Sequence, residues 1–329
     1  MIDQTLSVFE EHRRLLFGIA YRMLGSVTDA QDMVQESYLR WQQAADEAIR
    51  SPRAWLTTVV TRLCLKHLQL ARVKRESYVG PWLPEPLVDE HASDPAETTQ
   101  LADSLSLAFL VLLETLNPME RAVFILREGF DCEFADIARI VEKSEANCRQ
   151  ILARARKRIE ERRPRYDVSR TDAEKLVASF LAAVRNGDLE TMLASMADNV
   201  VLVADNGGRR GALLRRPLHG AQPVARVMIA AIRKHGSADD EVSRAMVNGL
   251  PGVVRFRDGR AQAVLAFGIS GGRIQAVFVI SNPDKLRHLG PPGADSPDQR
   301  QALSAYRREA TFRAPRDEKP GAVHYPLTF

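Results

Sequence analysis

The sequence has no hydrophobic run long enough to cross a membrane. None of its 329 residues lies in an apolar stretch that approaches the ~18 residues required by a spanning helix. Its first residues also lack the basic-then-apolar order of a secretory signal. With 45% hydrophobic and 27% charged residues, the composition is that of a globular protein. We therefore expect a protein that resides in the cytoplasm and contacts no membrane.

Cysteine is scarce, and its placement excludes the common metal sites. Cys64, Cys132 and Cys148 form no CxxC pair, and none has a histidine at zinc-ligand spacing. Each occupies an apolar position of an expected helix, which predicts three small buried side chains. No segment recurs at a fixed period, so a repeat architecture is also excluded. We expect neither a metal nor another cofactor.

Proline, by contrast, is concentrated between two helical parts of the chain. Residues 80–87 read GPWLPEPL, and their prolines oppose a helix because proline fixes φ and has no amide donor. An ordinary polar loop would not contain Trp82, Leu83 and Leu87. We interpret residues 77–98 as a stiffened linker between two helical domains and call it the strap.

Periodic patterns divide the rest of the chain into domains. Apolar residues recur at helical spacing on both sides of the strap, and the Ser-Pro pair at 51–52 and the Asn-Pro pair at 117–118 are helix start signals. One further helix, at 172–185, leads into strand-like segments with hairpin-turn signals at 257–260 and 270–273. Those segments are NVVLVAD, RGALLR, GVVRFRDG, AQAVLAFGI and IQAVFVIS. The expected parts are a helical domain at 1–76, the strap at 77–98, a helical domain at 99–165, an α+β domain at 170–289 and a flexible tail at 290–329.

The second helical domain contains the most specific pattern. A short amphipathic helix, FADIARIV, is separated by a tight turn from a second helix that Ser144 caps. Two such helices predict a helix-turn-helix, whose second helix enters the major groove of DNA. Residues 142–165 carry nine basic side chains against four acidic ones, which favours contact with phosphates. A solvated basic helix in an ordinary bundle is the alternative. The outer face of this helix is expected to carry Asn147, Arg149, Gln150, Arg154, Lys157 and Arg158.

The first helical domain has two polar faces. Its second helix carries an acidic face, and its third helix carries a basic face with threonines among the cations. Basic and hydroxyl groups suit a nucleic-acid backbone and splayed single-stranded bases. Taken alone, either face is also explained as solvated surface. The acidic face contains Asp29, Asp32, Gln35 and Glu36, and the basic face is expected to expose Arg53, Thr57, Thr61, Arg62, Lys66 and Gln69, followed by Arg72, Lys74 and Arg75.

Together these segments resemble a bacterial extracytoplasmic-function (ECF) sigma factor. The segments FGIAYRMLGSVTDAQDMVQESYLRW, SPRAWLTTVVTRLCLKHL and SEANCRQILARARKRI occur in the order and at the separation of that family's two domains. WLPEPL in the strap, DNGGR at 205–209 and NPDKL at 282–286 resemble the SigJ-like subgroup, in which Asn206 departs from the usual DGGGR. The resemblance covers residues 6–289. It implies a multi-domain fold with two all-α sigma domains, the second a helix-turn-helix, and an α+β NTF2-like (SnoaL-like) cone.

The resemblance also implies partners and residue roles. It implies an alternative sigma factor that binds core RNA polymerase, through the clamp of the largest subunit, and directs initiation at specific promoter DNA. The strap, which could extend to roughly 70 Å, would pass through the polymerase, and in the subgroup its motif would also contact the C-terminal domain, with Trp82 and Leu83 as anchors. The polymerase-binding residues would be Asp29, Asp32, Gln35 and Glu36. The minus-ten element would be read by Arg53, Thr61, Arg62, Lys66, Arg72, Lys74 and Arg75. The minus-thirty-five element would be read by Ser144, Asn147, Arg149, Gln150, Arg154 and Lys157, with Arg149 and Gln150 on bases.

The last domain is expected by resemblance to regulate the sigma factor in cis. Its two polar turns, at 205–209 and 282–286, are expected to expose their charged residues for contact with the sigma domains. An NTF2-like enzyme, or a one-component regulator with a small ligand in the cone, stays open as an alternative. Asp205 and His219 are candidate acid–base groups without a recognisable partner arrangement, so we expect no enzyme. The expected regulatory residues are Trp82, Leu83, Pro84, Glu85, Pro86, Asp205, Gly207, Gly208, Arg209, Asn282, Pro283, Asp284 and Lys285.

Overall fold

The computed structural model describes residues 2–44, 49–76, 78, 80–89, 107–160, 169–208 and 214–291, without the side chains of 2–4, 71–76 and 170. The chain forms two compact units, which are described separately. The helical unit contains residues 1–77 and 109–163, and the sheet unit contains residues 78–108 and 164–299. The strap therefore belongs with the sheet unit from Tyr78 onward. Most of the expected tail, from residue 292, lies outside the described residues.

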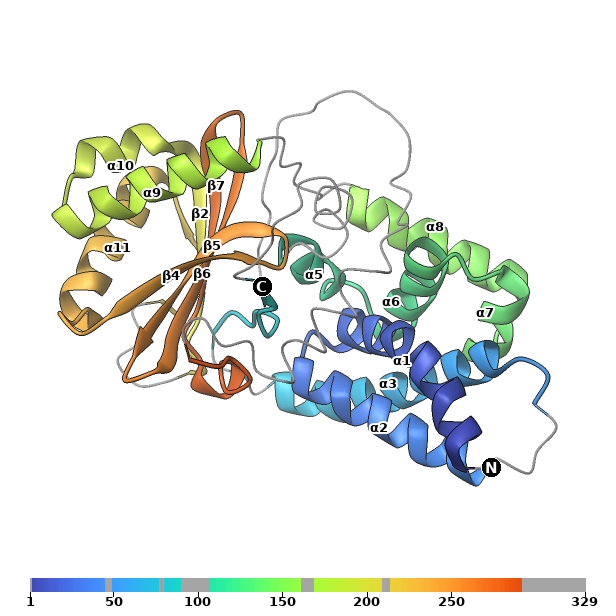
Figure 1. Ribbon diagram of the computed structural model, residues 1–329. Helices are drawn as coiled ribbons and strands as arrows, with labels where there is room; N and C mark the ends of the chain where they lie inside the picture. The colour runs from blue at the N-terminus through green and yellow to red at the C-terminus, as the bar shows by residue number, and fades with distance from the viewer. Residues whose placement is uncertain are drawn as a thin grey trace. The chain divides into compact units, whose positions relative to one another are not determined.

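Helices make up the first unit, as the sequence predicted (Figure 1). Helices α1, α2 and α3 form the first domain, in which the rings of Trp41 and Trp55 lie 5.5 Å apart between centroids. Cys64 and Cys148 are buried as expected, whereas Cys132 is half-buried. The helices are α1 (Ile2–Leu24), α2 (Val27–Gln43), α3 (Pro52–Glu76), α5 (Leu107–Leu113), α6 (Pro118–Phe124), the π-helix η1 (Ile125–Gly129), α7 (Phe134–Val141) and α8 (Glu145–Glu160).

The helix starts follow local capping chemistry. Asn117 and Glu120 form a capping box before α6, in which each side chain accepts a hydrogen bond from the other residue's amide, at 2.9 and 3.1 Å. The hydroxyl of Ser51 accepts from the amide of Ala54 at 3.3 Å, so the predicted start of α3 is confirmed. Thr28 and Asp29, which are both cap-forming residue types, lie inside α2 and do not cap it. Ser26 caps that helix, because its hydroxyl accepts from the Asp29 amide at 3.0 Å.

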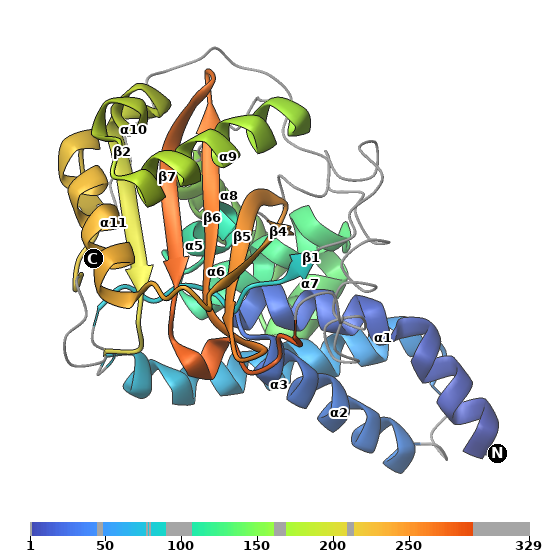
Figure 2. The same ribbon diagram turned by 60° about the vertical axis from the view of Figure 1, so that its left-hand side comes forward.

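The second unit is built on one mixed sheet. Its strand order is β1-β4-β5-β6-β7-β2-β3, and all neighbours are antiparallel except β2 and β7. The helices α9, α10 and α11 cover one face of this sheet (Figures 1 and 2). The strands are β1 (Val88–Asp89), β2 (Met196–Asp205), β3 (Leu218–His219), β4 (Glu241–Val247), β5 (Leu250–Arg257), β6 (Arg260–Ser270) and β7 (Arg273–Ile280), and the helices are α9 (Arg170–Asn186), α10 (Leu189–Ser195), α11 (Ala221–His235) and the 3₁₀ turn η2 (Pro283–Lys285).

Apolar side chains fill the space between these helices and the sheet. The rings of Phe180 on α9 and Phe267 on β6 meet edge-on, with centroids 5.8 Å apart. Met192, Met196 and Met228 lie in the same cluster, whose members are all apolar. This interior is therefore a packed core stabilised by the hydrophobic effect.

Several expectations for the sheet unit need correction. Strands β2, β5, β6 and β7 and the two hairpin turns are confirmed, and the turns place Asp258, Gly259, Gly271 and Gly272 at positive φ. Of the predicted strand RGALLR (residues 210–215), only Leu214 and Arg215 are described, and neither belongs to a strand; the other four residues lie outside the described part of the chain. The sequence reading also missed α10, α11 and β4.

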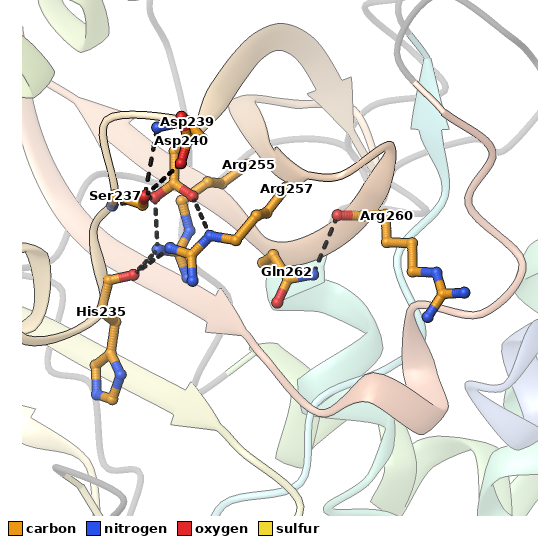
Figure 3. Close-up of polar contacts among 8 residues, drawn as sticks. All are labelled: His235, Ser237, Asp239, Asp240, Arg255, Arg257, Arg260 and Gln262. Atoms are coloured by element: carbon orange, nitrogen blue, oxygen red, sulfur yellow. Dashed lines mark hydrogen bonds and ion pairs between the residues drawn. The ribbon is translucent and has the colours of Figure 1, made fainter.

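A polar cluster joins the end of α11 to the sheet. Figure 3 shows Arg255 and Arg257 of β5 directed at Asp240, which precedes β4. The shortest nitrogen–carboxylate distances are 3.1 and 2.8 Å, and both arginines also donate to the His235 carbonyl oxygen, at 2.6 and 2.8 Å. Burial opposes ionisation of Asp240, yet hydrogen bonds from Arg257 and the Ser237 amide hold its pKa below the ordinary value. The two arginines thus supply hydrogen bonds to a carbonyl group at the end of α11, where the last carbonyl groups of a helix have no partner within it.

Candidate functional site

A buried ion pair in the sheet unit binds the strap. Asp205 is the last residue of β2 and is completely buried, and Lys285 is the last residue of η2. The Lys285 Nζ lies 2.7 Å from Asp205 Oδ2. Their side chains are 8% and 0% exposed, so both charges depend on each other and on nearby hydrogen bonds for stabilisation.

The peptide groups of Leu83 complete this ion pair. The Leu83 amide donates to Asp205 Oδ2 at 2.9 Å, and Lys285 Nζ donates to the Leu83 carbonyl oxygen. The same ammonium lies 3.9 Å from the centroid of the Trp82 ring, within cation–π range. The Leu83 side chain is 0% exposed. The two charged residues therefore recognise a specific stretch of strap backbone.

Tyr78 adds a second contact to the same carboxylate. Its hydroxyl donates to Asp205 Oδ1 and accepts from Asn282 Nδ2 at 3.1 Å. Burial, followed by the hydrogen bond to Asp205, raises the pKa of Tyr78 above its ordinary value. The sequence analysis did not single out Tyr78. The available signal was an aromatic residue with a hydroxyl group directly before the proline-rich segment.

The end of the strap joins the sheet through its backbone. The Leu87 amide donates to Asn248 Oδ1 at 3.0 Å, and the Asn248 amide donates to the Leu87 carbonyl oxygen at 2.8 Å. Strand β1 then pairs with β4 in antiparallel register, opposite Val247 and Met246. A ring nitrogen of His288 lies 2.8 Å from the Pro86 carbonyl oxygen. Asn248 and His288 were also missed by the sequence analysis.

The turn after β2 needs a glycine at Gly207. Its φ is +69°, and a Cβ there would lie 2.8 Å from Asn282 Oδ1. The Gly207 amide donates to Asp205 Oδ1 at 3.1 Å. Asn206, which departs from the subgroup pattern, accepts from the Gly208 amide at 3.1 Å and donates to the Leu214 carbonyl oxygen at 3.0 Å. Arg209 lies outside the described residues.

Two exposure predictions for this site are wrong. Lys285 was expected at the surface but is buried, because Asp205, Trp82 and the Leu83 carbonyl surround its ammonium. Asp205 was expected in an exposed turn, but it closes a buried strand. The other expected regulatory residues differ in their positions: Pro84, Glu85, Pro86 and Asn282 are buried, Pro283 is half-buried, and Asp284 is exposed beside Arg287.

The helix-turn-helix forms as predicted in the helical unit. Helix α7 ends at Glu142, which adopts a left-handed φ of 55°, and the Ser144 hydroxyl accepts from the Asn147 amide at 3.2 Å before α8. Arg158, expected on the outer face, instead donates to Glu120 Oε2 at 2.8 Å. The other expected DNA-reading residues of α8 are exposed, namely Asn147, Arg149, Gln150, Arg154 and Lys157.

The expected minus-ten face of α3 is only partly exposed. Arg53, Arg62 and Lys66 are exposed. Thr57 and Thr61 are buried, at 5% and 0%, so the prediction that they are exposed is wrong. The reason is tertiary, since α3 packs against α1, α2, α6 and α7 within the helical unit. The backbones of Arg72, Lys74 and Arg75 belong to α3, but their side chains lie outside the described part of the chain.

Arg62 joins α3 to the end of α7. Its Nε donates to the Ile140 carbonyl oxygen at 3.1 Å, and its Nη2 donates to the Arg139 carbonyl oxygen at 2.9 Å. The Nη2 also lies 3.0 Å from Glu142 Oε1. A guanidinium at a helix C-terminus is favourable because the last carbonyl groups there have no partner within the helix.

The acidic face of α2 is exposed in part. Asp32 and Gln35 are exposed, whereas Asp29 and Glu36 are half-buried. Asp29 Oδ2 lies 3.6 Å from His67 Nε2 on α3, and Glu36 accepts from Arg40 at 3.0 Å. No described helix is long and apolar enough to span a bilayer, and no cluster of three metal-binding side chains occurs among the described residues.

Known families match these parts of the chain. The model for Sigma-70 region 2 matches residues 8–73, and the model for Sigma-70, region 4 matches residues 106–159. The ECF RNA polymerase sigma factor SigJ of Mycobacterium tuberculosis is 36% identical over 292 residues, which is 85% of this chain and 93% of that protein. The probable ECF RNA polymerase sigma factor SigI of the same species is 34% identical over 87% of this chain and 96% of that protein.

A solved structure matches the whole architecture. The crystal structure of SigJ from Mycobacterium tuberculosis superposes with a TM-score of 0.68 at 34% identity, and it covers 87% of this chain and 99% of that one. The two sigma domains and the NTF2-like sheet domain follow in the order that the sequence predicted. The chain therefore belongs to the extracytoplasmic-function RNA polymerase sigma factors, the subunits that direct core polymerase to initiate transcription at specific promoters.

Proposed function

We propose that the NTF2-like domain regulates this sigma factor by holding the strap. One observation carries this proposal: both peptide groups of Leu83 are bonded, the amide to Asp205 and the carbonyl to Lys285. The backbone of a free linker would bond to water instead. An ion pair that bonds both the amide and the carbonyl group of one buried residue therefore indicates a binding site for the strap.

Docking of the strap competes with its use in transcription. In ECF sigma factors the segment between the two sigma domains is expected to pass through the polymerase. A strap that is bound from Tyr78 to β1 cannot follow that path at the same time. The chain then has a docked, restrained state and a released, polymerase-competent state. Any signal shifts this equilibrium only if it binds the two states with different affinity.

The bonding of Asp205 favours this holding role over enzyme chemistry. Oδ1 accepts from Tyr78 and Gly207, and Oδ2 accepts from Leu83 and Lys285. A general acid or base must reach the proton that it transfers, and each oxygen of this buried carboxylate already has two donors. The other candidate, His219, is exposed on β3. We therefore assign no catalytic role to either residue.

Polymerase binding is assigned to the acidic face of α2. Asp32 and Gln35 are exposed and available to basic groups on the clamp of the largest subunit. Asp29 and Glu36 already face His67 and Arg40, so they contribute less charge to a partner. The place of action is the cytoplasm, where the polymerase works.

Promoter reading is assigned to α8 and α3. The exposed residues of α8 read the minus-thirty-five element, and Arg53 and Lys66 contact the minus-ten region. Thr61 becomes available only when α3 separates from the helices packed against it, whereas Arg62 is exposed but bonded to the end of α7. The Thr61 hydroxyl is buried without a hydrogen-bond partner among the described residues, which costs free energy that separation would recover. The compact helical unit is therefore proposed to be the DNA-free form.

Hydrogen exchange on binding to polymerase tests the proposed competition. Amide exchange of residues 81–89 should be slow in the free full-length chain and faster once core polymerase is added. Residues 262–268 of β6 serve as the internal control and should keep their protection. Unchanged slow exchange of the strap in an active holoenzyme would contradict the proposal. Binding to duplex DNA without any promoter-directed initiation would instead favour a one-component regulator.

A further inference from the structure

Phe134 lies beside an arginine that we assign to base reading. It is the first residue of α7, and its ring centroid is 4.6 Å from the Cζ of Arg149 on α8. The Arg149 Nη2 also donates to Glu145 Oε2 at 3.0 Å. A guanidinium within about 6 Å of a ring centroid is attracted by the ring. Arg149 is therefore held at two points although its side chain is exposed.

The ring itself is held by a second arginine. The Cζ of Arg127 lies 5.2 Å from the Phe134 centroid. Arg127 Nη1 donates to the Cys132 carbonyl oxygen at 2.9 Å and lies 3.5 Å from carboxylate oxygens of both Asp131 and Glu133. These contacts tie Arg127 to the loop before α7. The ring thus contacts two arginines, Arg127, which is anchored to the loop, and Arg149, which is exposed.

Packing alone does not explain an aromatic residue at this position. Phe134 is only half-buried, whereas Ile137, Ile140 and Val141 form the buried face of α7. The spacing of FADIARIV predicts that Phe134, Ile137, Ala138 and Val141 face inward. Ile137 and Val141 are buried as predicted, whereas Phe134 and Ala138 are half-buried and Ile140 is buried instead. The additional contacts of Phe134 are with guanidinium groups.

We propose that Phe134 is a positioning residue that holds Arg149 in the conformation that reads the minus-thirty-five element. A free arginine loses rotamer freedom when it binds a base edge, but an arginine already held on a ring has lost part of that freedom on folding. Pre-positioning therefore strengthens contact with the correct base more than contact with phosphates. This inference rests on the proposed base-reading role of Arg149.

Promoter selection with full-length variants tests the inference. Thermal unfolding first shows that each variant is folded. Each holoenzyme then selects the promoters that it binds from a pool of DNA in which the minus-thirty-five element is randomised. Phe134→Leu removes the ring and keeps an apolar side chain, and Phe134→Tyr keeps the ring. Phe130→Leu is the matched control, because Phe130 holds a different guanidinium, that of Arg22, with Cζ 4.8 Å from the centroid.

The expected loss of base preference is confined to specific positions of the minus-thirty-five element. Arg149→Ala should relax base preference at one or two positions of the element. Phe134→Leu should relax preference at the same positions by about 3- to 10-fold, and Phe134→Tyr should restore the wild-type profile. Phe130→Leu should leave the profile unchanged. If Phe134→Leu does not fold, Phe134→Met takes its place with the same expectation.

The two ways to fail are distinguishable. If Arg149→Ala changes no base preference, the proposed reading role of Arg149 is wrong. If Arg149→Ala relaxes preference but the folded ring-less variant keeps the wild-type profile, the positioning role of Phe134 is wrong and the function stands. Equal weakening on all sequences by the ring-less variant also overturns the inference, because it indicates a purely structural role.

Discussion

Replacement of Lys285 by methionine is expected to release the strap. The substitution keeps a long apolar stem but removes the ammonium that lies 2.7 Å from Asp205 Oδ2 and bonds the Leu83 carbonyl. A completely buried carboxylate would then lack its cation, which costs about 3–5 kcal/mol. Since about 1.4 kcal/mol corresponds to a factor of ten, strap docking should weaken by roughly two to four orders of magnitude.

Native-state hydrogen exchange of the Leu83 and Leu87 amides measures this loss directly. Both amides donate to side chains of the sheet unit when the strap is docked, so their exchange reports on release. Lys175→Met is the matched control, because Lys175 is exposed on α9, and it should leave strap protection unchanged. Adding Asp205→Asn to Lys285→Met should recover part of the loss, since no buried charge remains unpaired. Wild-type protection in Lys285→Met would refute the reasoning.

Two further predictions concern the same site. Gly207→Ala should destabilise the chain by more than Gly271→Ala in thermal unfolding. Both place alanine at positive φ, at a cost of about 1–2 kcal/mol, but only a Cβ at Gly207 meets a neighbour, Asn282 Oδ1 at 2.8 Å; equal losses would contradict this. In the docked state the pKa of Tyr78 lies above its ordinary value. The protonated hydroxyl therefore stabilises docking fully below about pH 10, and this contribution is lost as the pH rises further and the hydroxyl ionises. The difference in tyrosinate absorbance between wild type and Tyr78→Phe should therefore titrate above pH 10, and a midpoint at the ordinary value would show that the hydroxyl is not held by Asp205.

Local signals predicted the secondary structure well where the chemistry is local. The capping box of Asn117 and Glu120 and the hairpin turn at Asp258-Gly259 involve residues within one turn of each other, so the sequence pattern contains the whole interaction. Helix α11 was missed because its residues are apolar on much of their length and Pro223 lies in its first turn. Such a segment is compatible with either a helix or a loop.

Exposure could not be predicted where remote segments meet. Lys285 follows the last strand and reads as a surface residue, but its burial depends on a strap that lies about 200 residues earlier in the chain. Thr61 belongs to a polar face of α3, but it is buried within the helical unit, where α3 packs against α1, α2, α6 and α7. Tyr78 and Asn248 gained their roles in the same way, from partners that no local pattern identifies. Asp205, Asn282 and Lys285 were predicted as regulatory residues together with the strap motif, whereas their burial and the roles of Tyr78, Asn248 and His288 required the tertiary structure.

The restraint exerted by the docked strap is tested most directly by promoter-directed transcription in vitro. Core polymerase would be titrated with wild type, Lys285→Met and Lys175→Met on a promoter selected by the holoenzyme. We expect Lys285→Met to reach half-maximal transcript at a lower concentration of sigma factor than wild type, and Lys175→Met to match wild type. An equal or higher half-maximal concentration for Lys285→Met, with the strap shown to be released by hydrogen exchange, would contradict regulation by strap docking.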